Sequence, residues 1–373
     1  MHYFIIAGEA SGDLHGAALI EALKAKDGEA RFSFLGGDRM SAAAGVPAII
    51  HNREMAFMGF SEVLKHLGKI FGNMKTTRNE LLRRHPDCVI LIDYPSFNLK
   101  IAKTAHKAGI PVYYYISPKI WAWKQWRIKD IRKYVDRMFS ILPFEVEFYG
   151  KHNYKIDYVG NPSVEEIAGI SAKLPCREEF LQKHRLRDRQ IVALLPGSRM
   201  GEIRCNLPVM VEAVRRFPQY RAVIAGAPDI ADEVYAAYCD FPVVRDETYA
   251  LLANSRAALV TSGTATLETA LLRVPQVVVY RSNGSKLTYK IMRKLVKVDY
   301  VSLPNLIAGR EIIPELLLHE CTADNISEHL THLLRDTDER RAQLDAYEEM
   351  SERLGKSTAA ETTATHILAA LSK

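Results

Sequence analysis

The sequence predicts an α/β protein made of two Rossmann-like domains, each built on a parallel β-sheet. Short apolar segments alternate with helix-like segments along the first half, which is the pattern of parallel βαβ units. The same alternation begins again after Val159-Gly160-Asn161-Pro162. Most strand-like segments end in a turn rich in small residues, where open α/β sheets hold their ligands. A chain of 373 residues is also long enough for two globular domains.

In the first half, apolar runs of four or five residues indicate buried strands. The first two end at Gly8 and at Gly36-Gly37. A helix is expected at about residues 15–26, and another is expected to end near Arg84, before the third strand. The strands are expected at residues 3–7, 32–35, 88–92, 112–116, 138–142 and 156–159.

In the second half, the apolar runs are again followed by small-residue turns. These strands are expected at residues 191–195, 220–225, 243–244, 258–260 and 276–280. Residues 322–371 are nearly all helix-forming, with a break at Gly355. We place the domain boundary within 162–172, which gives domains of residues 1–165 and 166–344.

Composition excludes several classes of protein. The longest apolar runs, at 89–92 and 277–280, fall far short of the ~20 residues that cross a bilayer, and the first residues do not resemble a signal peptide. The five cysteines are scattered, which favours free thiols in a reducing cytoplasm, and the spacing of cysteines and histidines predicts no metal site. The net charge of +6 lies entirely within residues 1–165, which carry 23 Lys and Arg against 17 Asp and Glu. This excess predicts an anionic partner such as a phosphate, a nucleic acid or a membrane surface.

Two turns of the first half hold candidate functional residues. The turn after the first strand contains Glu9, Ser11 and Gly12, and its glycines permit close backbone approach to a ligand. The residues fit equally well a plain turn in which Ser11 or Asp13 caps the next helix. Asp93 follows the strand at 88–92, where it is placed either as a general base or as a helix cap.

All three tryptophans lie close together in a basic segment, at positions 121, 123 and 126. This pattern suits base stacking, but it also suits aromatic packing under basic side chains. We expect a mixture, with Trp121 and Trp123 mainly structural.

Two turns of the second half resemble phosphate sites. Gly197-Ser198-Arg199 combines a glycine turn at a helix start with a guanidinium. In the second turn, the backbone N–H groups of Gly263, Thr264 and Ala265 are placed to hold a diphosphate, with Glu268 one helical turn further on to accept ribose hydroxyls. A capped helix with an acidic first turn is the simpler alternative.

Two basic amphipathic stretches, at about 60–78 and 281–297, suit either an anionic membrane surface or an ordinary surface helix. The two interpretations are equally consistent with these residues.

Taken together, the motifs resemble the lipid-A-disaccharide synthases, glycosyltransferases of the GT-B fold class, almost from end to end. The motifs are AGEASGD at 7–13, MGFSEV at 58–63, IDYPSFN at 92–98, SPKIWAW at 117–123, LPFEVEFY at 142–149, VGNP at 159–162, LPGSR at 195–199, TSGTATLE at 261–268 and LPN at 303–305. The sequence departs from the family at Asn161, where histidine is more common, and at 317–320, where a glutamine is common.

The resemblance implies two domains facing across a cleft, with residues 345–373 packing back on the first domain, and it is compatible with a homodimer that exchanges this region. It implies transfer of the sugar of UDP-2,3-diacylglucosamine to 2,3-diacylglucosamine 1-phosphate, giving a β(1→6)-linked disaccharide phosphate and UDP. It implies no cofactor and no metal, since helix N-termini and cations stabilise the leaving diphosphate in such enzymes and the sequence has no DxD triplet.

The resemblance also assigns roles to the candidate residues. Asp93 is the favoured general base and Glu9 the alternative, while Ser11, Gly12 and Asn98 line the acceptor side or orient the base. Met58 and the helix after it would receive acyl chains. The donor site would comprise Gly197, Ser198, Arg199, Gly263, Thr264, Ala265, Thr266 and Glu268.

The acylated substrates imply a peripheral position on the cytoplasmic face of the inner membrane. A GT-B type UDP-sugar epimerase is the competing enzyme, but it needs no acyl-binding helix. A nucleic-acid-binding protein is the competing non-enzyme, but the second half is neutral and carries two phosphate-type turns.

Overall fold

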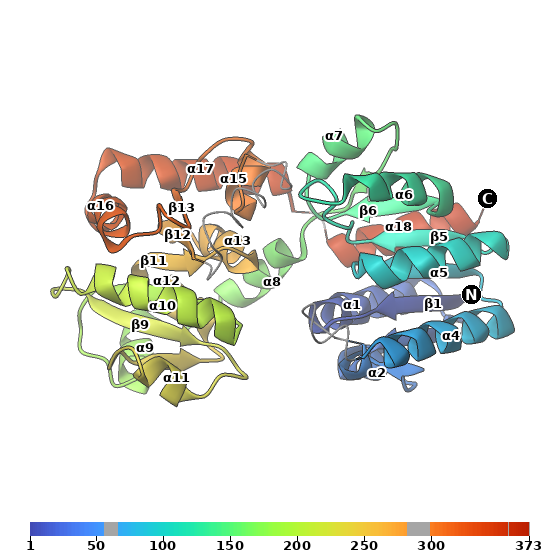
Figure 1. Cartoon of the computed structure of the whole chain (residues 1–373), viewed down its shortest axis with the longest axis horizontal. Helices are drawn as coiled ribbons and strands as arrows, with labels where there is room; N and C mark the ends of the chain where they lie inside the picture. The colour runs from blue at the N-terminus through green and yellow to red at the C-terminus, as the bar shows by residue number, and fades with distance from the viewer. Residues whose placement is uncertain (56–65, 282–298, 357, 373) are drawn as a thin grey trace. The chain divides into compact units, whose positions relative to one another are not determined.

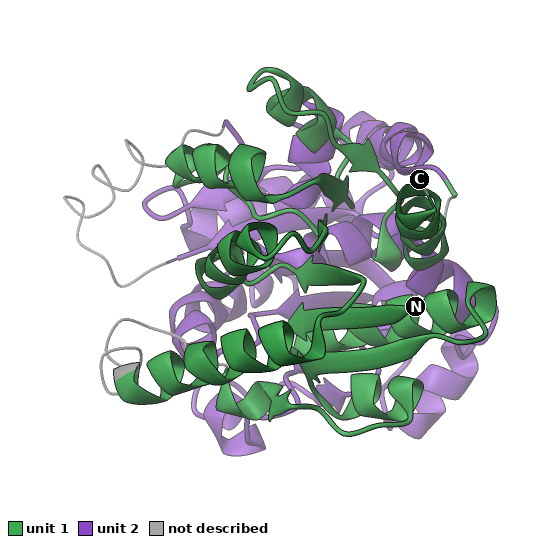
Figure 2. Ribbon diagram, turned by 90° about the vertical axis from the view of Figure 1, so that its right-hand side faces the viewer, with its two compact units in different colours: residues 1–162, 356–373 green, residues 163–355 purple. Residues whose placement is uncertain are grey.

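The computed structural model describes residues 1–55, 66–281, 299–356 and 358–372. They form two compact units (Figure 1; Figure 2). Unit 1 comprises residues 1–162 and 356–373, and unit 2 comprises residues 163–355. Each unit has its own parallel sheet, which confirms the predicted α/β fold with two Rossmann-like halves.

The sheet of unit 1 has seven parallel strands in the order β3-β2-β1-β4-β5-β6-β7. Its strands are β1 (His2–Ala7), β2 (Arg31–Gly36), β3 (Ile50–His51), β4 (Cys88–Ile92), β5 (Val112–Tyr115), β6 (Arg137–Ser140) and β7 (Asp157–Tyr158). Its helices are α1 (Ala10–Lys26), α2 (Asp38–Ala44), α4 (Leu67–Arg84), α5 (Pro95–Lys107), α6 (Ile128–Tyr134), α7 (Phe144–Gly150) and α18 (Ala359–Leu371), with short 3₁₀ turns η1 (Asn52–Glu54) and η2 (Gln125–Arg127).

The central strands of unit 1 are apolar throughout because helices cover both faces of the sheet. Along β1, Phe4 and Ile6 face one core, which also holds residues of α4, α5 and α6. Tyr3 and Ile5 face a second core, built with α1, α2 and α18. This alternation follows from the two-residue repeat of a strand.

The sheet of unit 2 has six parallel strands in the order β10-β9-β8-β11-β12-β13. They are β8 (Ile191–Leu195), β9 (Arg221–Gly226), β10 (Val243–Arg245), β11 (Ser255–Thr261), β12 (Gln276–Tyr280) and β13 (Glu315–Leu317). The helices are α8 (Pro162–Ser171), which begins at the unit boundary, α9 (Arg177–Lys183), α10 (Met200–Val214), α11 (Asp232–Ala236), α12 (Thr248–Ala253), α13 (Thr264–Leu271), α15 (Leu303–Ala308), α16 (Ala323–Leu334) and α17 (Asp338–Leu354). Helices α10 and α16 cover one face, and α9 and α12 the other.

The chain returns to unit 1 later than the expected residue 345. Residues up to Gly355 belong to unit 2, and those from Lys356 belong to unit 1. The reason is that α17 buries Ala346, Tyr347 and Met350, and Arg353 donates a 2.7 Å hydrogen bond to the carbonyl of Ala308 in the same unit. Helix α18 then packs against α1 (Figure 1).

The predicted strands are confirmed, with ends that shift by up to three residues. Strands β3 and β13, which have two and three residues and each lie at one edge of a sheet, were not expected. Helix α1 begins at Ala10, five residues earlier than expected, so Gly12 and Gly16 lie inside the helix rather than in a turn. A Cβ on Gly16 would lie 2.6 Å from the Met40 sulfur, so this glycine permits close packing of α1 on α2.

Within the described ranges, no helix combines the length and the hydropathy needed to cross a membrane. All five cysteines lie in these ranges, and each is a free thiol.

Candidate functional site

The turn after β4 has an unusual backbone. Asp93 and Tyr94 both adopt positive φ, at 42° and 48°. This left-handed conformation is strained for residues other than glycine, and such strain gathers at functional sites. Asn98 restrains the turn, because its amide donates hydrogen bonds to the carbonyl oxygens of Asp93, at 2.7 Å, and Ile92, at 3.2 Å. The Tyr114 hydroxyl donates a third hydrogen bond, also to the Asp93 carbonyl oxygen.

Tyr94 joins this turn to the one after β1. Its hydroxyl donates a 3.0 Å hydrogen bond to the carbonyl of Met55, and its ring lies against Gly8. A Cβ on Gly8 would lie 2.5 Å from two ring carbons, so only glycine fits this position. The contact brings Glu9, the next residue, to the same cavity as Asp93.

The cavity has a volume of about 610 Å³ and lies wholly within unit 1. Two carboxylates and four cations face it, together with apolar and aromatic side chains from α4, from the start of α5 and from the loops before α5 and η2. It is lined by Glu9, Ile70, Phe71, Met74, Arg78, Asp93, Tyr94, Pro95, Ser96, Phe97, Lys100, Lys119, Ile120, Trp123 and Arg127. A cavity with an apolar wall, a net positive charge and a partly buried carboxylate suits an amphipathic, anionic ligand.

The surroundings of the Asp93 carboxyl change its pKa. Burial raises its pKa above the ordinary aspartate value, and the Lys119 ammonium opposes that rise. A carboxylate with a raised pKa is a stronger base than an ordinary aspartate, which suits general-base catalysis near neutral pH. Arg127, which lines the same cavity, is held by a 2.7 Å hydrogen bond to the Ser96 hydroxyl.

The tryptophan segment divides into a buried anchor and an exposed rim. Trp121 is buried, and its indole N–H donates a 2.8 Å hydrogen bond to Glu145. Burial raises the pKa of Glu145 to about 7. Trp123 and Trp126 are 55% and 63% exposed, so the expectation that Trp123 is mainly structural is wrong, since Trp123 also lines the cavity.

The turn after β8 is partly occupied by the chain's own carboxylate. Gly197 has φ of 116°, and the Ser198 N–H donates a 3.1 Å hydrogen bond to Glu202. Arg199 also lies 3.7 Å from Glu202. An anion at this turn would therefore displace Glu202 or bind beside it.

The turn after β11 leaves Gly263 and Thr264 exposed at the start of α13, with Ala265 partly so. Thr266 differs, because it is fully buried, its hydroxyl donates to the Gly263 carbonyl at 2.8 Å, and its own carbonyl accepts from Gln276 at 2.9 Å. Its side chain therefore supports the turn and is not available to a ligand.

Glu268 follows one helical turn later. Burial, and then repulsion from Glu166, raise its pKa to about 7, against a hydrogen bond from Tyr249 that lowers it. The carboxyl is thus poised between its two protonation states near neutral pH.

The remaining predicted residues have mixed outcomes. Ser11 is exposed on the first turn of α1, whereas Gly12 is buried against Ala7. Asn98 is fully buried, so it restrains the Asp93 turn rather than lining the cavity. Met58 lies outside the described residues, as do residues 60–65 of the first amphipathic stretch and 282–297 of the second.

The proposed helix cap by Ser11 or Asp13 is wrong. Glu9 occupies the cap position of α1, and no side chain caps it. The buried Asp13 carboxylate instead accepts from the backbone N–H groups of Gly37, at 2.6 Å, and of Arg39 and Met40, both at 3.1 Å. It therefore caps the neighbouring helix α2.

Several cavity residues were not predicted as site residues. Arg78 and Met74 lie one turn apart on α4, within the first amphipathic stretch, and Lys100 and Ser96 lie one turn apart on α5. The helical spacing before the third expected strand was recognised, but nothing in the sequence pairs α4 with α5. Across the described ranges, no group of three His, Cys, Asp or Glu side chains could hold a metal ion.

Comparison with known proteins identifies a family that matches nearly the whole chain. Residues 3–368 match the family model described as Lipid-A-disaccharide synthetase. The chain is 41% identical to the lipid-A-disaccharide synthase of Myxococcus xanthus over 374 residues, covering 98% of this chain and 96% of the relative. It is also 41% identical to that of Acidobacterium capsulatum over 361 residues, covering 91% and 88%.

Solved structures with little sequence similarity share the fold. A Staphylococcus aureus MnaA–UDP structure aligns with a TM-score of 0.65 at 14% identity, covering 100% of this chain and 97% of that one. Acinetobacter baumannii MurG aligns with a TM-score of 0.60 at 12% identity, covering 99% of both chains. The UDP-GlcNAc 2-epimerase of Neisseria meningitidis, bound to UDP-GlcNAc, has the same TM-score at 14% identity, again with 99% of both chains covered. These likenesses concern the GT-B fold alone, and the fold expected from the sequence is confirmed.

Proposed function

Because the chain belongs to the lipid-A-disaccharide synthetase family, we propose that it transfers diacylglucosamine from UDP-2,3-diacylglucosamine to 2,3-diacylglucosamine 1-phosphate. The chain is a glycosyltransferase of lipid A disaccharide synthesis, as its motifs predicted. The whole-chain match does not favour the epimerase alternative. The products are the β(1→6)-linked disaccharide 1-phosphate and UDP.

The proposed chemical step is a single displacement with inversion. Asp93 takes the proton of the acceptor 6-hydroxyl as that oxygen attacks the anomeric carbon of the donor. The bond from this carbon to the diphosphate oxygen breaks, and UDP leaves with the bonding electrons. The observation that carries this proposal is the Asp93 carboxylate, which sits at a strained turn in a mixed apolar and cationic cavity.

The cavity of unit 1 suits the acceptor. Ile70, Phe71 and Met74 give an apolar wall for acyl chains. The cations of the lining, Arg127 and Lys119 among them, suit the 1-phosphate of the acceptor. Glu9 lines the same cavity and remains the alternative base.

The donor is assigned to unit 2. The exposed backbone N–H groups at the start of α13 would hold the diphosphate, with Arg199 adding a charged donor. Glu268 would accept hydrogen bonds from the ribose hydroxyls. Thr266, in contrast, would support this turn rather than contact the diphosphate, since its hydroxyl and its backbone N–H both donate to the Gly263 carbonyl, at 2.8 and 3.2 Å.

We assign the rim of the unit 1 cavity to an anionic membrane surface. Phe71 is 64% exposed, Trp123 and Trp126 are similarly exposed, and the Lys124 ammonium lies 4.0 Å from the centre of the Trp123 ring. Aromatic side chains beside cations are favoured at the interface between lipid headgroups and acyl chains. The protein would then bind peripherally at the cytoplasmic face of the inner membrane, where its acylated substrates lie.

The test is UDP release by purified protein with UDP-2,3-diacylglucosamine and detergent-dispersed acceptor. We expect acceptor-dependent release that falls ~10²–10⁴-fold in Asp93→Asn, the usual contribution of a general base. Glu9→Gln is the matched control, since it removes the other carboxylate of the cavity. Full activity in Asp93→Asn with loss in Glu9→Gln would transfer the base role to Glu9. No acceptor-dependent release by the wild type would refute the synthase reaction.

A further inference from the structure

A second cavity in unit 2 has no role in the proposed reaction. It has a volume of about 590 Å³ and lies where β8 and β11 begin, at Ile191 and Ser255. We call it the arginine cavity because four arginines line it with a single carboxylate, that of Asp188. The lining comprises Arg177, Asp188, Arg189, Gln190, Ile191, Ala253, Asn254, Ser255, Arg256 and Arg340. The lining groups carry four positive charges and one negative charge.

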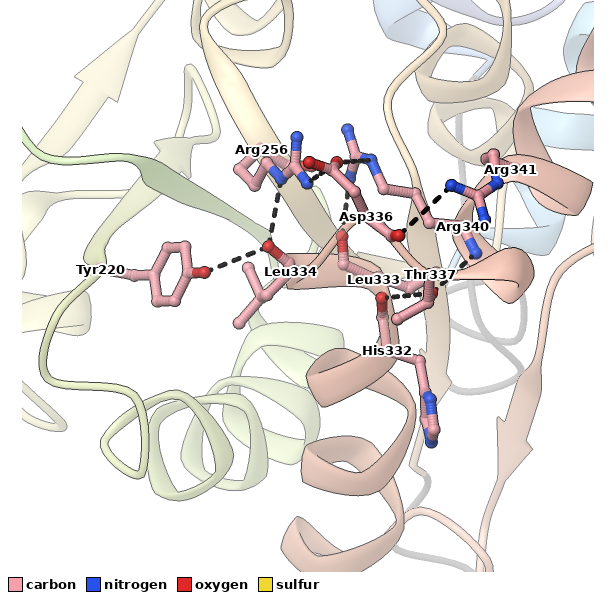
Figure 3. A network of polar contacts seen from close by, with 9 residues as sticks. All are labelled: Tyr220, Arg256, His332, Leu333, Leu334, Asp336, Thr337, Arg340 and Arg341. Atoms are coloured by element: carbon pink, nitrogen blue, oxygen red, sulfur yellow. Dashed lines mark hydrogen bonds and ion pairs between the residues drawn. The ribbon is translucent and has the colours of Figure 1, made fainter.

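Two of these arginines are largely buried and share one counterion. Arg256 and Arg340 converge on the same oxygen of Asp336 (Figure 3). The two guanidinium side chains are only 21% and 13% exposed, whereas Asp336 is 81% exposed. A solvated carboxylate compensates two poorly solvated cations incompletely. Burial and the nearby Arg256 charge lower the pKa of Arg340, as expected for a cation whose charge Asp336 compensates only in part.

Hydrogen bonds hold these guanidinium groups in fixed positions. Arg256 Nε donates to the carbonyl of Leu334 at 3.2 Å, and Arg340 Nη1 donates to the carbonyl of Leu333 at 2.6 Å. These two carbonyls end α16 and need donors, so the contacts have a structural purpose. They leave Arg256 Nη1 and Arg340 Nη2 without an acceptor among the residues that the structure describes.

The other two arginines extend the donor surface. Arg177 bonds Asp188 and the carbonyl of Arg189, which fixes the loop between α9 and β8. Arg189 is exposed, and its guanidinium makes one hydrogen bond in the described part of the chain, from Nη1 to the carbonyl of Pro218 at 3.1 Å. Its Nε and Nη2 therefore remain available to a ligand.

The arginine cavity is separate from the proposed donor site. The nucleotide turns follow Leu195 and Thr261, which are the last residues of β8 and β11, whereas the cavity lies at the first residues of the same strands. At about 3.3 Å per residue, the two sites are on the order of 15–20 Å apart. A UDP bound at the turns would not reach the cavity.

We propose that the arginine cavity binds a ligand that carries a phosphate or diphosphate group. Guanidinium forks match phosphate oxygens in shape and charge, and here they are held in place before the ligand arrives. A bound phosphate would also supply the negative charge that Asp336 provides only in part. The same chemistry is offered by a soluble phosphate compound and by the headgroup of an anionic phospholipid.

The test is an isothermal titration calorimetry experiment, in which inorganic pyrophosphate is titrated into the full-length protein and the heat of binding is measured. Because pyrophosphate also fits the nucleotide turns, the titration is made at saturating UDP and repeated in Arg199→Ala. We expect binding that weakens at least ~10-fold in Arg189→Ala and in Arg256→Lys, which keeps the charge but loses the fork. Arg341→Ala is the matched control, since Arg341 is an exposed arginine of α17 outside the lining.

The second arm uses vesicles of phosphatidylcholine with or without phosphatidylglycerol. Pyrophosphate binding with the expected variant pattern would support a soluble ligand. Binding only to anionic vesicles, weakened by Arg189→Ala and not by Arg341→Ala, would support a lipid headgroup. The proposal would be overturned if the protein bound neither pyrophosphate nor the anionic vesicles. It would also be overturned if wild type and Arg189→Ala bound them equally. Loss of acceptor-dependent UDP release would refute the synthase proposal without affecting this result, and Arg189→Ala is expected to retain that activity.

Discussion

At the scale of single residues, the properties of Asp93 come from its neighbours. Its backbone strain is held by Asn98 and Tyr114, and its pKa is set by burial against the attraction of Lys119. The choice of Asp93 as the candidate base could be predicted from the IDYPSFN motif. The contacts that hold its backbone and influence its pKa could not be predicted, because Tyr114 and Lys119 come from a different strand and loop.

Replacing Lys119 by methionine is expected to move the acidic limb of the pH profile of kcat/KM to higher pH. Without the ammonium, burial raises the pKa of Asp93 further, and the base form is reached only at higher pH. Lys100→Met is the control, because Lys100 lines the same cavity but does not set this pKa. If the acidic limb of the kcat/KM profile does not move in Lys119→Met, a group other than Asp93 sets that limb.

UDP affinity is expected to rise with pH, because Glu268, in its proposed role as the ribose ligand, would accept hydrogen bonds best as a carboxylate. With a pKa of about 7, affinity should be ~10-fold lower near pH 6 than above pH 8. Glu166→Gln removes the repulsion, lowers the pKa of Glu268 and so strengthens binding near pH 6. Calorimetry with UDP measures this, with the exposed Glu178→Gln as control. Equal pH dependence in wild type and Glu166→Gln would contradict the coupling.

At the scale of elements, the site depends on two strand-to-helix turns that touch. β1 and β4 pair in the sheet, so the turns after them lie side by side, and Gly8 leaves room for the Tyr94 ring. Any parallel sheet puts the turns after its strands at one edge, but the pairing of β1 with β4 was not predicted from the sequence. The close ring contact was not predicted either, because it depends on the left-handed backbone of Tyr94.

Gly8→Ala is expected to lower both kcat and stability. A methyl group 2.5 Å from the Tyr94 ring would displace that ring and the adjoining Asp93, at a cost of ~1–3 kcal/mol. Gly28→Ala is the control, since nothing lies within 4 Å of its added Cβ. Steady-state UDP release and thermal unfolding measure the two effects. Unchanged kcat in a destabilised Gly8→Ala would show that the turn contact serves folding alone.

In the two candidate phosphate turns of unit 2, the hydrogen-bond partners could not be predicted from the sequence. The glycine turn after β8 was expected to attract an anion, but Glu202 on the following helix already bonds it. Thr266 was expected to bind diphosphate, but its hydroxyl closes the first turn of α13. In both cases the residue type was informative, whereas the hydrogen-bond partner was decided by the local fold.

At the scale of the molecule, the chain leaves unit 1 at residue 162 and rejoins it at residue 356. Helix α18 completes the second core of unit 1 with Ala359, Ala364 and Ile367, all at most 1% exposed. The resemblance predicted such a return, but the exact start depended on which unit buries α17.

Ile367→Ala is expected to destabilise unit 1 by ~2–5 kcal/mol, because it opens a cavity beneath α18. All three tryptophans, at 121, 123 and 126, belong to unit 1, so intrinsic fluorescence during urea unfolding reports on that unit. Ile326→Ala makes a similar change in the core of unit 2 and is the control. A fluorescence midpoint that moves in Ile326→Ala but not in Ile367→Ala would contradict the role of α18.

The late return of α18 has a consequence for how the protein is made. Unit 1 lacks one of its core helices until the ribosome has translated unit 2, which spans 193 residues from 163 to 355. At ~5–20 residues per second, this delay is roughly 10–40 s. During that interval the apolar groove that receives α18 stays uncovered on the nascent chain. Unit 2 can therefore complete its core first, and unit 1, although translated earlier, finishes folding last.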